Sequence, residues 1–346
     1  LGYLPALKTI NINENRFTGP LPEEWGSLAS LRVLILYVNE LTGTIPTTFS
    51  GLTNITYFDV GSNKFTGTLP NYMEYMNTVE QFYADENSLE GPIPGFPPGL
   101  KLLLLDSNYL PGTLPASLST LTEIVLYGNL LHGSIPSSWS QLPNMLYIDL
   151  GGNYFTGPLP NVQGGHPLRY FYANDNAFTG TIPARLGTGE NLSSLLLYNN
   201  QLEGTIPREF SELRFLESIS LDYNKITGNL DGVFNSTLQT NLNLIKFNNN
   251  QLSGSIPKEI FKLPNLHTLL LGSNCFTGTL PRQICSQHSL MSVSLDGLSS
   301  ASTCRTPLLF GLTSSYLSSG VFSGTIMSCL FDLPNIDTLH LSGNFF

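Results

Sequence analysis

An asparagine-centred frame recurs along nearly the whole chain and constrains its fold more than any other feature. Its clearest copy reads LLLYNNQLEGTIP over residues 195–207. A glycine follows each marking asparagine by four residues, and a proline follows every one by seven, except Asn224, where Asp231 takes the place. Successive spacings are 24, 24, 24, 21, 21, 24, 23, 24, 24, 26 and 24 residues, which predicts a solenoid of stacked repeats. The asparagines are Asn15, Asn39, Asn63, Asn87, Asn108, Asn129, Asn153, Asn176, Asn200, Asn224, Asn250 and Asn274.

Each position of the frame has a physical role in such a stack. Leu195 and Leu197 alternate with Leu196 and Tyr198, which is the period of a short strand with one buried face. The asparagine side chain is expected to turn inward and satisfy backbone groups of neighbouring loops. Glycine permits a backbone conformation that other residues resist, and proline fixes φ where the chain turns. Because no repeat can bury its apolar face alone, each depends on its neighbours.

The frame LxxLxLxxNxLxGxIP resembles the plant-type leucine-rich repeat of plant receptor kinase ectodomains and secreted polygalacturonase inhibitors. This resemblance implies a curved, right-handed leucine-rich-repeat solenoid of about 14 rungs. A parallel sheet would line its concave side, with short strands and 3₁₀ turns on the convex side. The N-terminal end lacks a paired-cysteine cap and the cysteines are arranged unusually. These departures suggest an algal or protist relative of the plant proteins.

The pattern breaks late in the chain. The frame requires asparagine at position 298 but has Leu298, and it returns only at Phe322 to Ile326. We therefore expect a regular array over 1–298, an inserted loop over 299–321, and resumed, truncated repeats over 322–346. The loop could take part in ligand binding, as interruptions in plant receptor ectodomains do, or could be a stapled structural insertion.

All four cysteines surround this break, and four cysteines allow three pairings. Cys285 and Cys329 occupy similar convex positions of successive rungs, so they are expected to pair, while Cys275 and Cys304 tie down the loop. No CxxC spacing is present and the nearby His288 is isolated, which argues against a metal site.

Composition narrows the class of partner. The net charge is −10 with 12% charged residues and no basic stripe, so nucleic acid is a poor partner. No apolar run is long enough to span a membrane. The chain begins and stops in mid-repeat without polar caps, so we expect a longer parent chain or a subunit that covers the ends. Three glycosylation sequons, at Asn54, Asn191 and Asn235, join the cysteines and the resemblance in favouring an extracellular or cell-surface glycoprotein.

In this fold the outward positions of each concave strand lie six, four and two residues before the asparagine. These positions are rich in tyrosine and aspartate, and Lys246 and His340 are nearly their only cations. The candidate ligand-binding residues are Tyr37, Tyr57, Asp59, Tyr83, Asp85, Asp106, Tyr127, Tyr147, Asp149, Tyr170, Tyr172, Tyr198 and Asp222. Tyrosine offers a flat apolar face with a hydroxyl, and aspartate accepts hydrogen bonds or pairs with basic groups.

This candidate face also repeats itself. The segment YFDVG at 57–61 matches YIDLG at 147–151, and FYADEN at 82–87 matches FYANDN at 171–176. Four rungs thus form a larger unit that occurs twice. Either a segmental duplication has not diverged, or the ligand is itself extended or periodic, such as a polysaccharide or a stretch of peptide.

Nothing in the sequence resembles a catalytic constellation. Phosphate-loop, serine-hydrolase and zinc-protease motifs are absent, and the five histidines are scattered. The adjacent Asp85 and Glu86 are expected to have unshifted pKa values, because nothing apolar is expected to enclose them. We therefore expect no enzymatic activity and no cofactor.

The leading function is a recognition module whose concave acidic and aromatic face binds peptide, protein or glycan. The first alternative is a structural or adhesive glycoprotein that assembles head-to-tail through its uncapped ends into filaments or matrix. The second alternative is an inhibitor of a secreted hydrolase, which rests on the resemblance alone.

Overall fold

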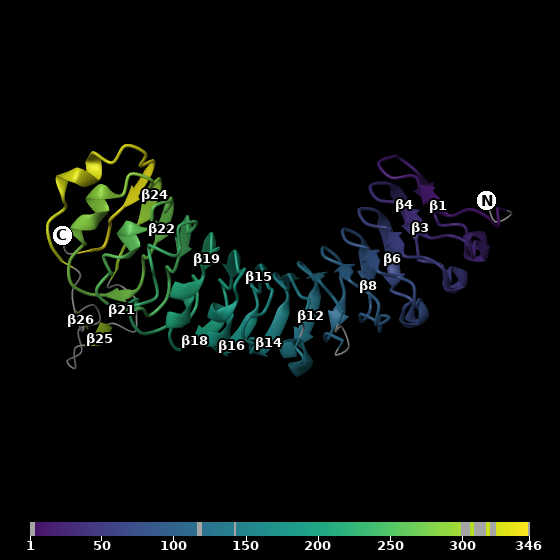
Figure 1. Ribbon diagram of the computed structural model, residues 1–346, viewed down its shortest axis with the longest axis horizontal. Helices are drawn as coiled ribbons and strands as arrows, with labels where there is room; N and C mark the ends of the chain where they lie inside the picture. The colour runs from purple at the N-terminus through teal and green to yellow at the C-terminus, as the bar shows by residue number, and fades with distance from the viewer. Residues whose placement is uncertain are drawn as a thin grey trace. The chain divides into compact units, whose positions relative to one another are not determined.

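A computed structural model of the protein describes residues 4–115, 120–141, 143–298, 305–307, 316–318 and 323–344 (Figure 1). The chain divides into two compact units, Leu1–Val162 and Gln163–Phe346. Each unit contributes seven strands of a parallel ladder, so the described residues contain 14 such strands, as the repeat count predicts. The chain is therefore a leucine-rich-repeat solenoid.

The ladder strands are three residues long and follow one another in chain order. Those of unit 1 are β1 (Thr9–Asn11), β3 (Val33–Ile35), β5 (Tyr57–Asp59), β7 (Gln81–Tyr83), β9 (Leu102–Leu104), β11 (Glu123–Val125) and β13 (Tyr147–Asp149). Those of unit 2 are β15 (Tyr170–Tyr172), β17 (Ser194–Leu196), β19 (Ser218–Ser220), β20 (Leu244–Lys246), β22 (Thr268–Leu270), β24 (Ser292–Ser294) and β27 (Thr338–His340).

Short second strands follow most ladder strands and lie at or just before the glycine of the frame. In unit 1 they are β2 (Thr18–Gly19), β4 (Glu40–Gly43), β6 (Lys64–Thr68), β8 (Ser88–Glu90), β10 (Pro111–Gly112), β12 (Leu130–Gly133) and β14 (Tyr154–Pro158). In unit 2 they are β16 (Ala177–Thr181), β18 (Gln201–Glu203), β21 (Ser253–Gly254) and β23 (Cys275–Phe276). Most of them pair in parallel with the second strand of the next rung, in separate sheets of four, five and two strands.

Single 3₁₀ turns complete many of the rungs. The frame's proline directly precedes several of them, with φ of −65° at Pro22 and −62° at Pro207, which the pyrrolidine ring favours. In unit 1 they are η1 (Glu23–Ser27), η2 (Thr47–Gly51), η3 (Asn71–Tyr75) and η4 (Ser137–Gln141). In unit 2 they are η5 (Ala184–Thr188), η6 (Arg208–Glu212), η7 (Ile260–Lys262), η8 (Arg282–Ser286) and η10 (Ser328–Phe331).

Stacked apolar side chains form the core between the ladder strands and the 3₁₀ turns. In unit 1, Phe58 packs against Phe49 and Phe82, with ring centroids 6.1 and 5.3 Å apart. All three rings are at most 1% exposed. The frame's asparagines are mostly buried beside this core, with Asn108 at 5% and Asn274 at 0% exposure. Burial of such side chains against their neighbours is the main stabilising contribution.

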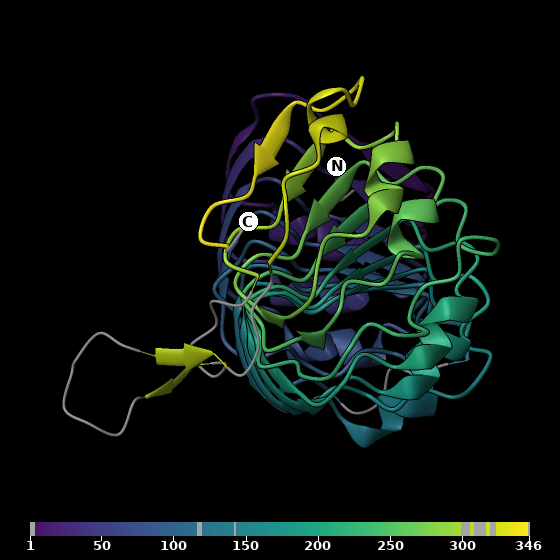
Figure 2. The same ribbon diagram turned by 90° about the vertical axis from the view of Figure 1, so that its left-hand side faces the viewer.

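Near the C-terminal end, β24 pairs directly with β27, so the ladder continues beyond the break. Within the predicted insertion, β25 (Arg305–Pro307) and β26 (Tyr316–Ser318) form a separate antiparallel pair (Figure 2). Cys285 and Cys329 form a disulfide, as their similar positions predict. Cys275 is also disulfide-bonded, whereas Cys304 lies outside the described residues.

The predicted boundaries at 298/299 and 321/322 stay predictions. The boundary between the two compact units lies after Val162. No helix in the described part of the chain is long and apolar enough to cross a membrane.

Candidate ligand-binding face

Five adjacent strands of unit 1, β5 to β13, place predicted residues in three rows across the sheet. β5 and β7 pair in register, so Tyr57 lies beside Gln81 and Asp59 beside Tyr83, and the register continues to β13. The five-rung patch consists of the first and third residue of each of these five strands, together with the residue two positions after each strand. Its rows are Tyr57, Gln81, Leu102, Glu123 and Tyr147; Asp59, Tyr83, Leu104, Val125 and Asp149; and Gly61, Asp85, Asp106, Tyr127 and Gly151.

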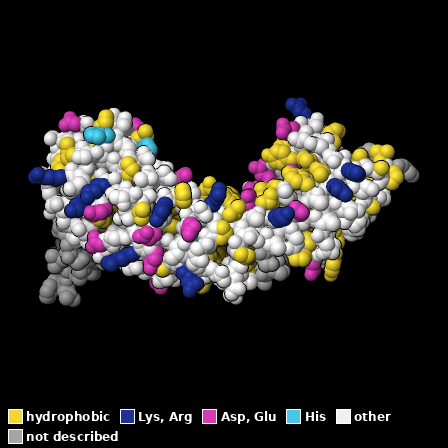
Figure 3. Space-filling model, viewed as in Figure 1, with side chains coloured by type: hydrophobic (Ala, Val, Ile, Leu, Met, Phe, Trp, Pro, Cys, Tyr) yellow, Lys and Arg dark blue, Asp and Glu magenta, His cyan; other side chains and the backbone are white. Residues whose placement is uncertain are grey.

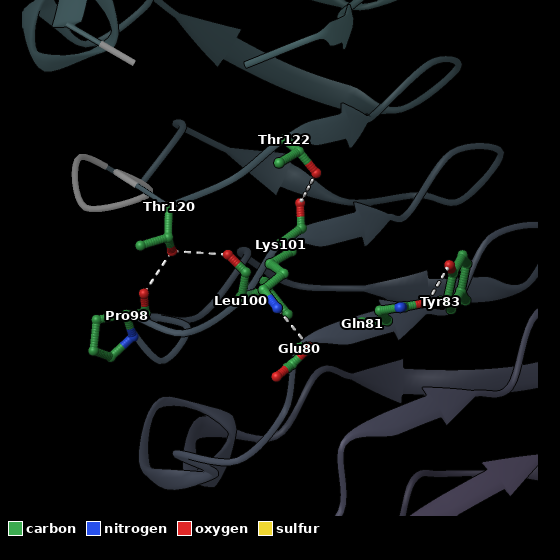
Figure 4. A network of polar contacts seen from close by, with 8 residues as sticks. All are labelled: Glu80, Gln81, Tyr83, Pro98, Leu100, Lys101, Thr120 and Thr122. Atoms are coloured by element: carbon green, nitrogen blue, oxygen red, sulfur yellow. Dashed lines mark hydrogen bonds and ion pairs between the residues drawn. The ribbon is translucent and has the colours of Figure 1, made fainter. Parts of the chain in front are cut away.

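Two tyrosines form an aromatic surface at one end of the five-rung patch. The rings of Tyr57 and Tyr83 lie with centroids 5.2 Å apart at an interplanar angle of 32°. The Tyr83 hydroxyl donates to Gln81 Oε1 at 3.0 Å (Figure 4). Burial raises the pKa of both phenols, and the Asp59 carboxylate raises that of Tyr57 further. Both rings are therefore neutral, fixed and partly open to a ligand.

A glycine makes room for the central carboxylate of the patch. A Cβ on Gly61 would lie 2.7 Å from Asp85 Oδ1, so the Asp85 side chain occupies the space that a larger residue would fill. The Gly61 N–H also donates to Asp59 Oδ1 at 3.0 Å. Two carboxylates from adjacent rungs thus meet at one glycine.

Burial raises the pKa values of the aspartates in the patch. The pKa of Asp85 rises to about 6, mainly through burial and then through the neighbouring Asp106 carboxylate. Burial likewise raises the pKa of Asp149 to about 6, partly offset by a hydrogen bond of 2.9 Å from the Gly151 N–H. The expectation of an unshifted Asp85 pKa was therefore wrong, because this carboxylate is partly buried within the patch and lies near other carboxylates.

The carboxylates of the patch form no ion pair with any described cationic residue. The ion pairs recorded among the described residues are Lys64–Glu40, Lys101–Glu80 and His340–Asp296, all outside it. Figure 4 shows the Lys101–Glu80 pair on the far side of the strands from Tyr83. Acidic and hydrophobic-class side chains lie next to one another on part of unit 1 in Figure 3.

The sequence reasoning did not single out Glu123, although its charge acts on Tyr83 and raises the pKa of that phenol. Glu123 lies six residues before Asn129, which is one of the outward positions predicted for every rung, so the sequence pattern could have identified it. Tyr37 lies two residues beyond β3, outside the patch, and is 38% exposed.

Unit 2 has a less acidic set of predicted residues. The rings of Tyr170 and Tyr172 on β15 are 6.3 Å apart, and the Tyr198 hydroxyl accepts a 2.9 Å hydrogen bond from Asn174 Nδ2. Burial raises the pKa of Asp222, whereas the hydrogen bond from Ser220 and the charge of Lys246 oppose the shift. Serines missed by the sequence reasoning lie here as well, with Ser194 Oγ and Ser218 Oγ 2.6 Å apart.

The remaining predicted sites stay predictions. Asn54 and Asn191 are exposed, and Asn235 is half-buried with its Oδ1 accepting from the Thr237 hydroxyl at 2.7 Å. Among the described residues, no group of three or more His, Cys, Asp or Glu side chains could hold a metal ion.

Some of the repeats match a known protein family. The Leucine Rich Repeat family profile matches residues 6–28, 30–52 and 191–213. No curated protein matches the chain. The profile thus matches three of the repeats, and the fold and frame of the chain are those of plant-type leucine-rich repeats.

Solved structures similar to the chain include plant receptor ectodomains. A TDR receptor structure matches with a TM-score of 0.82 and 28% identity over 97% of this chain and 55% of that one. The PEPR1–AtPEP1 structure gives 0.80 and 28%, over 99% and 49%. The ectodomain of the Arabidopsis receptor kinase HAESA, in complex with an N-terminally extended IDA peptide hormone, gives 0.73 and 26%, over 98% and 62%. The chain thus spans about half to three-fifths of the length of these proteins.

Proposed function

We propose that the chain is a non-enzymatic extracellular recognition module whose five-rung patch binds an extended peptide carrying basic side chains. The observation that carries this proposal is the cluster of one buried carboxylate, Asp59, and two half-buried ones, Asp85 and Asp106, that form no ion pair among the described residues. Burying a charge is unfavourable unless it is paired. A ligand ammonium or guanidinium group would supply the missing partner for Asp59, Asp85 and Asp106.

The dimensions of the patch suit a short extended segment. Strands of a sheet lie about 4.8 Å apart, so four spacings from β5 to β13 span about 19 Å. An extended peptide rises about 3.3 Å per residue, so about six residues would cross the patch. The repeated YxDxG segments at 57–61 and 147–151 stand at its two ends and would hold similar groups.

The side chains match the chemistry of basic residues. A guanidinium forms paired, charge-assisted hydrogen bonds with a carboxylate and also stacks on aromatic faces. Tyr57 and Tyr83 present such faces next to Asp59 and Asp85. Peptide partners of the similar PEPR1 and HAESA structures support a peptide over a glycan. The sequons and disulfides support an extracellular location.

The test is a selection from a displayed library of random 12-residue peptides against the chain. We expect enriched peptides to be rich in Arg and Lys. Their affinity should fall at least tenfold for the Asp59→Asn/Asp85→Asn/Asp106→Asn variant, since each lost charge pair contributes about 1.5–3 kcal/mol. Titration of a fluorescent copy of the best peptide measures this loss.

A matched control carries the same charge change elsewhere. Glu23, Glu24 and Glu74 lie on η1 and η3, and changing them together to Gln should leave the affinity within about twofold. Equal losses in both variants would mean that net charge alone attracts the peptides. Selection of peptides without basic residues, or of none, would contradict the proposal.

A further inference from the structure

A buried histidine replaces a core leucine at one place in unit 2. The residue directly after each 3₁₀ turn is usually a buried leucine or methionine, as at Leu28, Leu52 and Leu213, each at most 1% exposed. After η5 this residue is Gly189, which leaves the position without a side chain. A Cβ on Gly189 would lie 2.2–2.8 Å from ring atoms of His166, so the imidazole of the preceding rung fills the space.

The imidazole in this position lacks polar partners. His166 is 7% exposed, and neither Nδ1 nor Nε2 has a hydrogen-bond partner among the described residues. Other polar residues at the same place in a rung are paired: Gln239 Nε2 donates to Phe210 O at 2.8 Å and Gln287 Nε2 to Leu263 O. His166 is thus held mainly by packing, with the backbone groups of Arg185 and Leu186 close enough to act on its pKa but outside hydrogen-bond geometry, and its neutral form suits the site.

Burial lowers the pKa of His166, and the backbone groups of Leu186 and Arg185 only partly oppose the shift. The charged side chains on the packed elements are Arg185 and Glu190 around η5, Arg208, Glu209 and Glu212 on η6, and Arg169 before β15. None of them forms an ion pair with the imidazole in the described part of the chain. No carboxylate is therefore placed to stabilise an imidazolium here.

We propose that His166 makes the rung of Tyr170 and Tyr172 acid-sensitive, because a protonated imidazole leaves its place against Gly189 and the η5 turn opens. Arg169 O accepts from the N–H groups of Ser193 and Ser194 at 2.8 and 3.1 Å and so links this rung to β17. Opening therefore loosens the strand pair that carries the two tyrosines.

The direction of the pH effect follows from proton binding. Below pH about 6.5 the unfolded or opened chain protonates His166, whereas the closed rung does not. Stability of the closed rung is therefore complete above about 6.5 and falls as the pH drops through this value towards the lower folded-state pKa. Within that window the opening constant should rise by up to about tenfold per pH unit.

The experiment is hydrogen exchange of residues 184–196 at pH 7 and pH 5, with intrinsic exchange rates corrected. The wild-type chain should lose at least tenfold protection at pH 5. The variant H166A/G189L places a leucine directly after η5, as in most other rungs, and removes the His166 imidazole. It should keep the same protection at both pH values.

Two further variants complete the test. His166→Ala alone leaves a cavity, so it should lower protection equally at both pH values. His132→Ala, which changes an exposed histidine of unit 1, should behave as wild type. An unchanged wild-type protection at pH 5, or the same acid loss in H166A/G189L, would overturn the proposal. The test needs no ligand, so it is independent of the proposed function.

Discussion

At the scale of single residues, the asparagine of each frame is the main polar link between rungs. Asn108 Oδ1 accepts from the Leu89 N–H at 2.9 Å, and its Nδ2 donates to Ala84 O at 2.9 Å and Leu105 O at 3.2 Å. One buried amide thus satisfies backbone groups of two successive rungs. No other side chain has a carbonyl and two N–H groups at this length, which explains the constancy of asparagine.

We expect Asn108→Ala to lower the free energy of unfolding by about 3 kcal/mol, because it leaves several buried backbone groups unpaired at about 1–3 kcal/mol each. Urea denaturation followed by circular dichroism measures the change. Asn77→Ala, at an exposed asparagine, should stay within about 0.5 kcal/mol of wild type. A loss under about 1 kcal/mol for Asn108→Ala would show that water replaces the amide.

At the scale of elements, both backbone conformation and close packing require the glycine of the frame. Gly91 has a φ of +75°, and a Cβ on it would lie 2.6 Å from the Thr68 methyl group of the preceding rung. The same arrangement joins Thr181 to Gly204 in unit 2. Backbone strain and close packing therefore act together where the second strands meet.

Three variants separate the two effects. Gly19→Ala meets nothing within 4 Å at a φ of +86°, so it should cost about 1 kcal/mol of unfolding free energy from strain alone. Gly91→Ala should cost about 1–3 kcal/mol more, through overpacking against Thr68. Adding Thr68→Ser removes that methyl group and should restore most of the difference. Equal losses for Gly19→Ala and Gly91→Ala in urea denaturation would exclude the packing effect.

Elements also show how the frame tolerates its one break. Leu298 stands where asparagine is expected, and its backbone carbonyl accepts the Phe276 N–H at 2.8 Å in place of the missing amide oxygen. The regular pattern then resumes, since Asn344 Oδ1 accepts from the Leu298 N–H at 2.9 Å. A backbone group thus substitutes for the side chain.

At the scale of the whole molecule, periodicity predicted most of the fold because every rung uses the same backbone hydrogen bonds. The ladder strands, the buried asparagines and the Cys285–Cys329 bond all follow from spacing. The outward rows were predicted for the same reason. The raised pKa of Asp85 and the exchange of a leucine for His166 were not, because both depend on contacts between rungs that no single repeat contains.

Asp85 and Asp149 in unit 1 should respond to acid in the direction opposite to that of His166 in unit 2. In unit 1, Asp85 and Asp149 have folded-state pKa values of about 6, above the unfolded value of about 3.9. Between these values the folded unit binds more protons than the unfolded chain, so its stability rises as the pH falls from about 7 towards 5. His166 acts the opposite way in unit 2, where acid removes stability.

Tryptophan fluorescence can separate the two responses, because both tryptophans, Trp25 and Trp139, lie in unit 1. We expect the urea midpoint measured by fluorescence to rise between pH 7.5 and pH 5.5. Asp85→Asn/Asp149→Asn should raise the midpoint at pH 7.5 and flatten its pH dependence, since the buried charges are gone. A midpoint that falls with acid in wild type, or an unchanged slope in the variant, would show that water and counterions already neutralise the patch. Repeating the titration with H166A/G189L removes the contribution of His166, so any remaining slope belongs to the carboxylates.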